Sequence, residues 1–93
     1  MSGKEHPISL LCDAHTIPML MFLRENGPSR KTDIYASVGR SANMPLKIAR
    51  LEGSGLVLVN EVGISDVVGL TELGESVAKK LGEIDSLMLE QVP

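Results

Sequence analysis

The order of apolar and polar residues predicts two helical segments at the start of the chain, over residues 8–13 and 16–26. The second helix tolerates Pro18 in its first turn and ends at the stop signal Gly27-Pro28. Residues 19–23 are apolar on every side of that helix. A surface helix would alternate, so we expect this helix either to be central in the fold or to be covered by a partner.

A helix of about two turns is predicted over residues 32–38. Thr32 is suited to the N-cap position, because its hydroxyl can accept a hydrogen bond from a backbone N–H of the first turn. Asp33 favours the positive end of the helix dipole, and Gly39 ends the helix.

The next helix is predicted over residues 42–53, starting near Ser41 or Asn43, with Pro45 in its opening turn. Gly53 or Gly55 then supplies the left-handed residue that ends it. Its apolar residues are spaced i, i+4 and i+7 and form one buried stripe: Met44, Ile48 and Leu51.

Two β-rich runs between residues 56 and 70 turn back near Glu61–Asp66 and predict a hairpin. A long helix follows over residues 71–90, with Thr71 as its N-cap and Glu72 in its first turn. The apolar stripe of this helix is too broad for a lone surface helix. It therefore packs either within one protomer or against a partner.

The order of these elements predicts the fold class. A helix-turn-helix whose second helix leads directly into a two-stranded wing requires such closely spaced stop and start signals, and few other small folds do. We therefore expect one α+β, mostly helical domain over residues 1–93. It would be a winged helix-turn-helix with a two-stranded β wing at 56–70 and a C-terminal dimerisation helix.

Charge is unevenly distributed along the chain. The whole sequence carries a net charge of −3, which by itself counts against nucleic-acid binding. Residues 24–50, however, hold six basic and two acidic residues and so carry +4, while the remaining three basic and ten acidic residues give −7. We expect the basic segment to gather into a single patch that approaches a polyanion.

The cellular setting is indicated by two further features. No run of about 18 apolar residues exists, so we expect no membrane span. A single cysteine excludes an internal disulfide framework and is typical of a reducing, cytoplasmic environment.

Five motifs, in order and over about residues 6–80, resemble the HxlR-like, ArsR and MarR winged-helix transcriptional regulators, or an archaeal variant of them. "HPISLL" resembles the "CPI…L" opening, and "MLMFLRENGP" resembles "ILRELLxGP". "RKTDIYASVG" is similar to "RFSELRRALG", and "MPLKIARLEGSGLV" to "LSRRLRELEEAGLV". "GLTELG" is similar to the "YxLTxxG" that closes the wing. The resemblance implies a regulator that binds double-stranded DNA with some sequence preference.

The resemblance also implies that residues 41–53 form the recognition helix. Lys and Arg can donate to guanine or phosphate, Asn suits adenine, and a leucine can contact a thymine methyl or a protein. The residues expected in the groove are Asn43, Leu46, Lys47 and Arg50. Those expected to contact phosphates are Arg30, Lys31, Thr32, Tyr35, Arg40 and Ser41. The sequence departs from the family at the wing, where Glu61 and Asp66 replace the usual basic residues.

A homodimer is expected, because a chain of 93 residues has a surplus of Leu and Met to cover. The residues expected at the interface are Leu11, Met19, Phe22, Val77, Leu81, Ile84, Leu87 and Met88. Dimerisation would place two recognition helices on half-sites about one helical turn apart.

Other functions have weaker support. His6, Cys12 and His15 could together bind zinc or copper, but Cys12 is more readily explained as a small buried hydrophobe, so we expect no metal and no cofactor. Redox sensing through Cys12 is a further alternative. No nucleophile elbow or phosphate-binding glycine loop is present, so we expect no enzyme. The rival function is a winged-helix module that binds protein instead of DNA. The sequence indicates no particular small-molecule effector.

Overall fold

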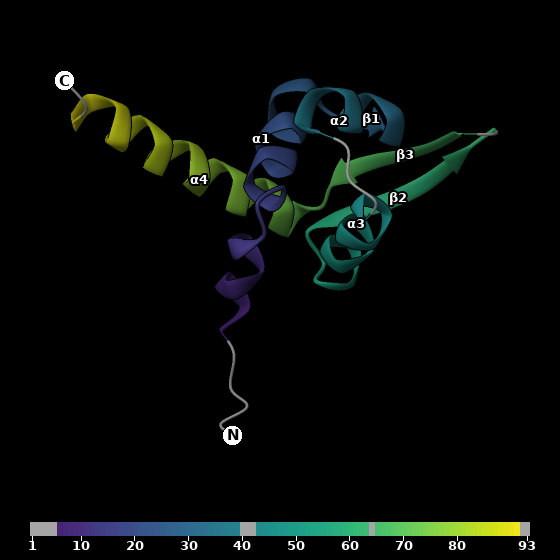
Figure 1. Ribbon diagram of the computed structural model, residues 1–93, viewed down its shortest axis with the longest axis horizontal. Coiled ribbons are helices and arrows are strands. Elements are labelled where there is room, and N and C mark those ends of the chain that lie inside the picture. The colour runs from purple at the N-terminus through teal and green to yellow at the C-terminus, as the bar shows by residue number, and fades with distance from the viewer. Residues whose placement is uncertain (1–5, 40–42, 64, 92–93) are drawn as a thin grey trace.

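The computed structural model describes residues 6–39, 43–63 and 65–91. Its mostly helical α+β arrangement is the predicted one (Figure 1). The elements are, in chain order, the 3₁₀ helix η1 (Pro7–Cys12), α1 (Thr16–Asn26), β1 (Ser29–Arg30), α2 (Lys31–Val38), α3 (Met44–Gly53), β2 (Val57–Val62), β3 (Ser65–Leu70) and α4 (Glu72–Gln91).

The sheet has three antiparallel strands in the order β1-β3-β2, one more than the sequence predicts. Strands β2 and β3 form the expected hairpin, with Glu61 opposite Asp66. The additional strand, β1, pairs Ser29 with Val68 and Arg30 with Val67. This pairing ties the chain between α1 and α2 to the base of the wing, and so fixes the wing relative to the helices.

The start of α2 differs from the prediction. The helix begins at Lys31, so Thr32 lies in its first turn and is not the N-cap. Arg30 occupies the N-cap position with an extended backbone and without a side-chain capping hydrogen bond. The reason is the pairing of Arg30 with β3, which keeps the backbone extended up to that residue.

Helix α3 also ends in a way that resolves an open alternative. Gly53 is the last residue of the helix, and Gly55, with φ of 80°, is the left-handed residue after it. An L-residue with a side chain is strained in that conformation, whereas glycine adopts it readily. The tight reversal leads directly into β2, as the expected helix-to-wing connection requires.

Helix α1 is central within the protomer. Its apolar residues Met19, Leu20 and Leu23 are at most 2% exposed. They belong to one core with the inner faces of α2, α3, the sheet and α4. The helix is therefore covered by its own chain, and the buried Met19 cannot belong to a subunit interface as the sequence suggested.

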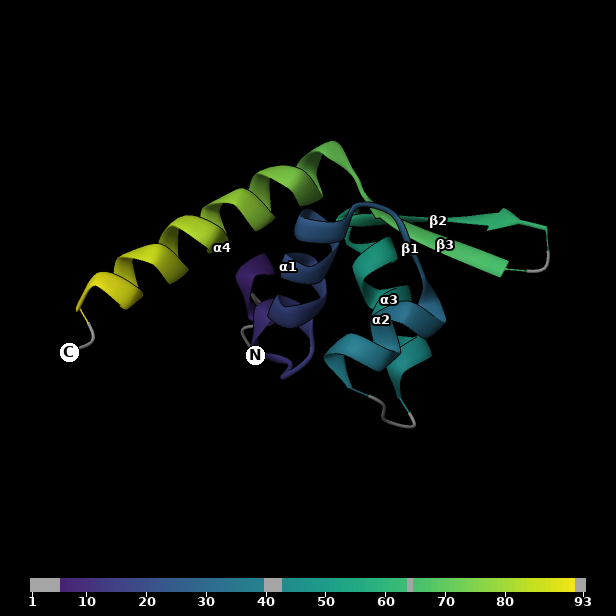
Figure 2. The same ribbon diagram turned by 90° about the horizontal axis from the view of Figure 1, so that it is seen from above.

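Helix α4 is anchored at its start and extends away from the body at its end. The Thr71 hydroxyl accepts a hydrogen bond from the Gly74 N–H at 2.9 Å and donates one to the Gly55 carbonyl. Gly74 and Ala78 then pack closely against the core. The rest of α4 extends beyond α1, in the direction opposite to the tip of the β2–β3 hairpin (Figure 2). No helix in the described part of the chain is long and apolar enough to cross a membrane.

Candidate nucleic-acid interface

Helix α3 presents one face to the core and the opposite face to solvent. Met44, Ile48 and Leu51 point inward and are at most 2% exposed. At about 100° per residue, the opposite side is centred on Leu46 and Gly53, with Ala49 and Arg50 beside them. Leu46 is 52% exposed, and Arg50 is exposed as well. The outward face of the expected recognition helix is therefore open, but it holds few charges.

Lys47 does not lie on this open face, contrary to the prediction. Its side chain is only 15% exposed, and its Nζ lies 3.1 Å from Oδ1 of Asp13. The same Nζ lies 2.8 Å from Nδ1 of His15. Lys47 lies next to the buried stripe, on the side of α3 that faces the connection between η1 and α1. Its ammonium therefore reaches Asp13 and His15.

Asp13 and His15 are held in place by local backbone geometry. Oδ1 of Asp13 accepts a hydrogen bond from the His15 N–H at 2.9 Å, and the Asp13 carbonyl accepts one from the Thr16 N–H. An Asp side chain commonly accepts a hydrogen bond from the backbone N–H two residues later and so forms a turn before a helix. The His15 N–H and then the Lys47 ammonium hold the pKa of Asp13 below its ordinary value, although partial burial acts to raise it.

The ring of His15 contacts two elements. Nδ1 lies 2.8 Å from the Lys47 ammonium, which has only donors, so Nδ1 is the acceptor in this hydrogen bond. Nε2 faces Gly39, directly after α2, where a Cβ would lie 3.6 Å from it. The Asp13–His15–Lys47 cluster thus joins the connection before α1 to both helices of the helix-turn-helix.

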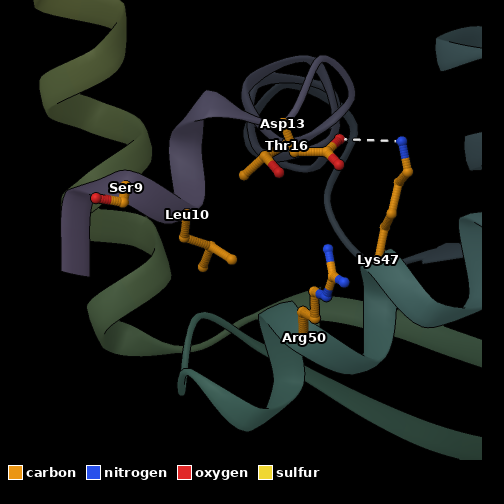
Figure 3. A pocket seen from close by; sticks show the side chains of 6 residues that line it. All are labelled: Ser9, Leu10, Asp13, Thr16, Lys47 and Arg50. Carbon is orange, nitrogen blue, oxygen red and sulfur yellow. Dashed lines mark ion pairs between the residues drawn. The ribbon is translucent and has the colours of Figure 1, made fainter. Parts of the chain in front are cut away.

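Beside this cluster lies a small hollow of about 190 Å³ (Figure 3). Arg50 projects into it from α3, opposite Asp13 and Thr16 at the start of α1. Within the described part of the chain, no carboxylate pairs with the Arg50 guanidinium. The hollow is lined by Ser9, Leu10, Asp13, Thr16, Lys47 and Arg50.

The other expected phosphate contacts are only partly available. Lys31 Nζ lies 3.2 Å from Oδ2 of Asp66 on the wing, so a second lysine also has an aspartate partner. Arg30 and Thr32 are exposed. Tyr35 is half-buried and packs against the core. Arg40 and Ser41 lie outside the described residues, and Asn43 is exposed directly before α3.

Of the described basic residues between positions 24 and 50, Arg24 lies apart from the helix-turn-helix, so the expected single patch does not include all of them. Arg24 lies against α4, where a Cβ added at Gly82 would come within 2.9 Å of its guanidinium. Of the cations described between residues 24 and 50, Lys31 and Lys47 have aspartate partners. Arg30 and Arg50 are the exposed cations that remain on β1 and α3. Among the described residues, the positive charge without a carboxylate partner at this face is therefore small.

The residues expected at a dimer interface fall into three groups. Met19 is buried inside the protomer, as described above, and Leu11, Phe22, Val77 and Leu81 are partly buried against the core. Ile84, Leu87 and Met88 are 52–61% exposed on the projecting half of α4. Along the preceding part of α4, from Leu73 to Ile84, η1 and α4 enclose an apolar groove of about 410 Å³ that also includes Ile8 and Leu11.

The remaining candidates give no metal site. Among residues 6–39, 43–63 and 65–91, no group of three His, Cys, Asp or Glu side chains is arranged to hold a metal ion. Cys12 is exposed, which corrects its interpretation as a buried hydrophobe. Nδ1 of His15 is hydrogen-bonded to the Lys47 ammonium.

The sequence matches no family model and no curated protein. The structure, in contrast, is similar to several solved ones. AF1382 from Archaeoglobus fulgidus has a TM-score of 0.75 at 20% identity, over 89% of this chain and 97% of that one. A transcriptional regulator homologue from Pyrococcus horikoshii OT3 has a TM-score of 0.73 at 22% identity, over 86% and 85%. Reduced AbfR bound to DNA has a TM-score of 0.69 at 18% identity, over 94% of this chain and 64% of that one.

The fold is a winged helix-turn-helix. The transcriptional regulator homologue from Pyrococcus horikoshii shares this fold, and in this chain the 20-residue helix α4 follows the wing. In this frame α2 and α3 are the helix-turn-helix, and the β2–β3 hairpin is the wing. Sequence reasoning missed Asp13 and His15 as members of the site. The Asp-x-His spacing before a helix indicates a turn, but not that Lys47 reaches it.

Proposed function

We propose that the protein is a transcriptional regulator that binds double-stranded DNA as a homodimer, with α3 in the major groove. The observation that carries the proposal is the open outward face of α3, with Arg50 exposed on it and the wing beside it. Its fold is shared with a regulator, AbfR, whose solved structure is bound to DNA.

The exposed residues of α3 suggest separate roles in the groove. Arg50 can donate two hydrogen bonds to a guanine, and Asn43 can pair with an adenine edge. Leu46 would contact a thymine methyl. Arg30, exposed on β1, would contact the phosphate backbone. Because few cations are available, affinity should be modest, and the steepness of its fall with salt should be limited by the small number of phosphate contacts.

The projecting half of α4 supports a twofold dimer. Its exposed Ile84, Leu87 and Met88 lie beyond the reach of the protomer's own core, and the apolar groove beside η1 is open to a second copy. An exposed apolar surface of this kind commonly marks an interface. In such a dimer the two α3 helices would address half-sites about 34 Å apart.

A mobility-shift experiment tests DNA binding. The wild type should shift genomic fragments at about 50 mM salt and much less at about 200 mM. Arg50→Ala should weaken binding about tenfold, because one base contact of this type contributes that much discrimination. Lys79→Ala, which removes the same charge from the distant surface of α4, should change binding less than about twofold. Failure of the wild type to shift any fragment at low salt would exclude the proposal.

Light scattering tests the dimer. The wild type should have twice the chain mass of 10.0 kDa. Ile84→Glu/Leu87→Glu should give monomers, because two charges would be placed in the apolar contact. Ser86→Glu lies on the other side of α4 and should leave the dimer intact. A monomeric wild type would show that α4 serves another purpose.

A protein-binding module is the second candidate function. Leu46 on α3 and Leu58 on β2 are each more than half exposed, and Glu61 near the tip of the wing is acidic. These features suit a protein surface better than a phosphate backbone. If the wild type binds no DNA, this candidate predicts that Leu46→Glu abolishes association with a protein partner that the wild type retains.

A further inference from the structure

We propose that Asp13 is a positioning residue for Lys47: it holds this lysine against the protein body and competes for it with DNA phosphates. The inference rests on the proposed function, because it concerns how the recognition helix becomes available to DNA. Nζ of Lys47 lies 3.1 Å from Asp13 Oδ1 and 2.8 Å from His15 Nδ1. Two of its three donors are therefore used within the protein.

The carboxylate is fixed more firmly than the lysine that it holds. Asp13 follows η1, and its Oδ1 also accepts the His15 N–H at 2.9 Å. Lys47, in contrast, reaches the cluster through a flexible four-carbon side chain. When Lys47 moves toward a phosphate, Asp13 therefore stays behind with its charge, and the phosphate must replace both Asp13 and His15 as acceptors.

The exposure of the pair suits an exchange of partners. The side chains of Lys47 and Asp13 are 15% and 25% exposed, so water still reaches them. A fully buried ion pair would be too costly to break, whereas a freely exposed one would restrain the lysine little. The pair lies between these limits. On α3, the direction of Lys47 differs by about 67° from the mean direction of the buried stripe, so Lys47 lies on the border of the open face.

This competition has a distinct signature in the salt dependence of binding. A free lysine that contacts a phosphate releases a condensed counterion. Each such contact makes the slope of the logarithm of the binding constant against the logarithm of the salt concentration steeper by about 0.9. In the wild type, the abandoned Asp13 carboxylate keeps its negative charge beside the phosphates and offsets the counterion release. Lys47 then contributes little to the slope until Asp13 is neutralised.

The first experiment measures whether Asp13 holds Lys47, without any DNA. Limited acetylation with acetic anhydride, read by peptide mass spectrometry, gives the reaction rate of Lys47 relative to that of Lys79. Asp13→Asn keeps an oxygen that can accept the His15 N–H but loses the charge. It should raise the relative rate about threefold. Asp33→Asn removes an equal charge from the first turn of α2 and should leave the rate unchanged. Equal rates in the wild type and Asp13→Asn would overturn the proposal.

The second experiment measures the competition. Asp13→Asn should bind DNA about fivefold more tightly than the wild type at 100 mM salt, with a slope steeper by about 0.9. In a Lys47→Ala background the same substitution should have neither effect. A similar gain from Asp33→Asn, or a gain that persists without Lys47, would show a general charge effect and overturn the proposal.

The two experiments separate the inference from the proposed function. If the wild type binds no DNA, the proposed function and the competition for phosphate both fail, and acetylation still decides whether Asp13 holds Lys47. If DNA is bound but Asp13→Asn changes neither affinity nor slope, the competition alone is excluded.

Discussion

Helices α3 and α4 both carry an apolar stripe, but the protomer covers the two stripes differently. In α3 all three stripe residues, Met44, Ile48 and Leu51, are almost completely buried. In α4 the stripe is covered only in part: Val77 and Leu81 are partly buried, whereas Ile84 and Leu87 on the projecting half are more than half exposed, as is Leu73 in the first turn. An amphipathic pattern thus shows that a face needs cover, but not what covers it.

The difference follows from the lengths of the packed helices. Helix α4 has 20 residues and is about 30 Å long, whereas α1, against which it packs, has 11 and is about 16 Å long. Helix α1 cannot cover both halves of α4. The uncovered half is therefore a consequence of the fold, and the proposed dimer would bury it.

The largest effect is expected where α4 meets the core most closely. A Cβ at Gly74 would collide with the carbonyl oxygen of Leu56, which is backbone and cannot move aside easily. We expect Gly74→Ala to lower the free energy of unfolding by about 4 kcal/mol or more, or to prevent folding. Urea denaturation followed by circular dichroism measures the change.

The same substitution in α3 provides the control. Nothing lies within 4 Å of a Cβ placed at Gly53. Because alanine has a higher helix propensity than glycine, Gly53→Ala should stabilise the protein by up to about 1 kcal/mol. If both variants lost stability equally, the close approach of α4 to Leu56 would not be what anchors the helix.

A pair of truncations compares the two stripes directly. Ile48→Ala should cost about 3 kcal/mol, because it leaves a cavity in the core. Leu87→Ala should cost less than about 0.5 kcal/mol in the monomer, where its side chain is exposed. Denaturation at several protein concentrations separates the contributions: only the cost of Leu87→Ala should grow with concentration, since it would act through the dimer. A large cost at the lowest concentration would mean that α4 folds back on its own protomer.

Most helix boundaries could be predicted from the sequence because their signals are local. Thr71 caps α4 as expected, and Gly27 and Gly39 follow the ends of α1 and α2. Pro45 lies in the first turn of α3. Each signal acts through backbone groups within a few residues, so no knowledge of distant contacts is needed.

The wrong predictions depended on residues far apart in the sequence. Strand β1 has only two residues and exists because it pairs with β3, nearly forty residues later. That pairing also displaced Thr32 from the N-cap. The position of Lys47 depends on Asp13, on a different segment of the chain. Helical periodicity placed Lys47 on a polar face, but it could not show that a carboxylate lies opposite.

Lys47 provides the last contrast, because α3 is held at its flank by an ion pair while the end of α4 is not. The pKa of Asp13 is lowered in the folded protein, so its charge stabilises the fold at pH values above the ordinary aspartate value of 3.8. This contribution is lost as the pH falls below 3.8 through the folded-state pKa. Asp13→Asn has no such titration. We therefore expect its Tm to be roughly 3 °C below that of the wild type at pH 7, with the gap closing below about pH 3.8. Thermal unfolding of both proteins, with Asp33→Asn as the control, measures the gap. A gap that stayed constant from pH 7 to pH 3 would mean that the charge of Asp13 does not stabilise the fold, because the substitution keeps the acceptor of the His15 N–H and removes only the charge.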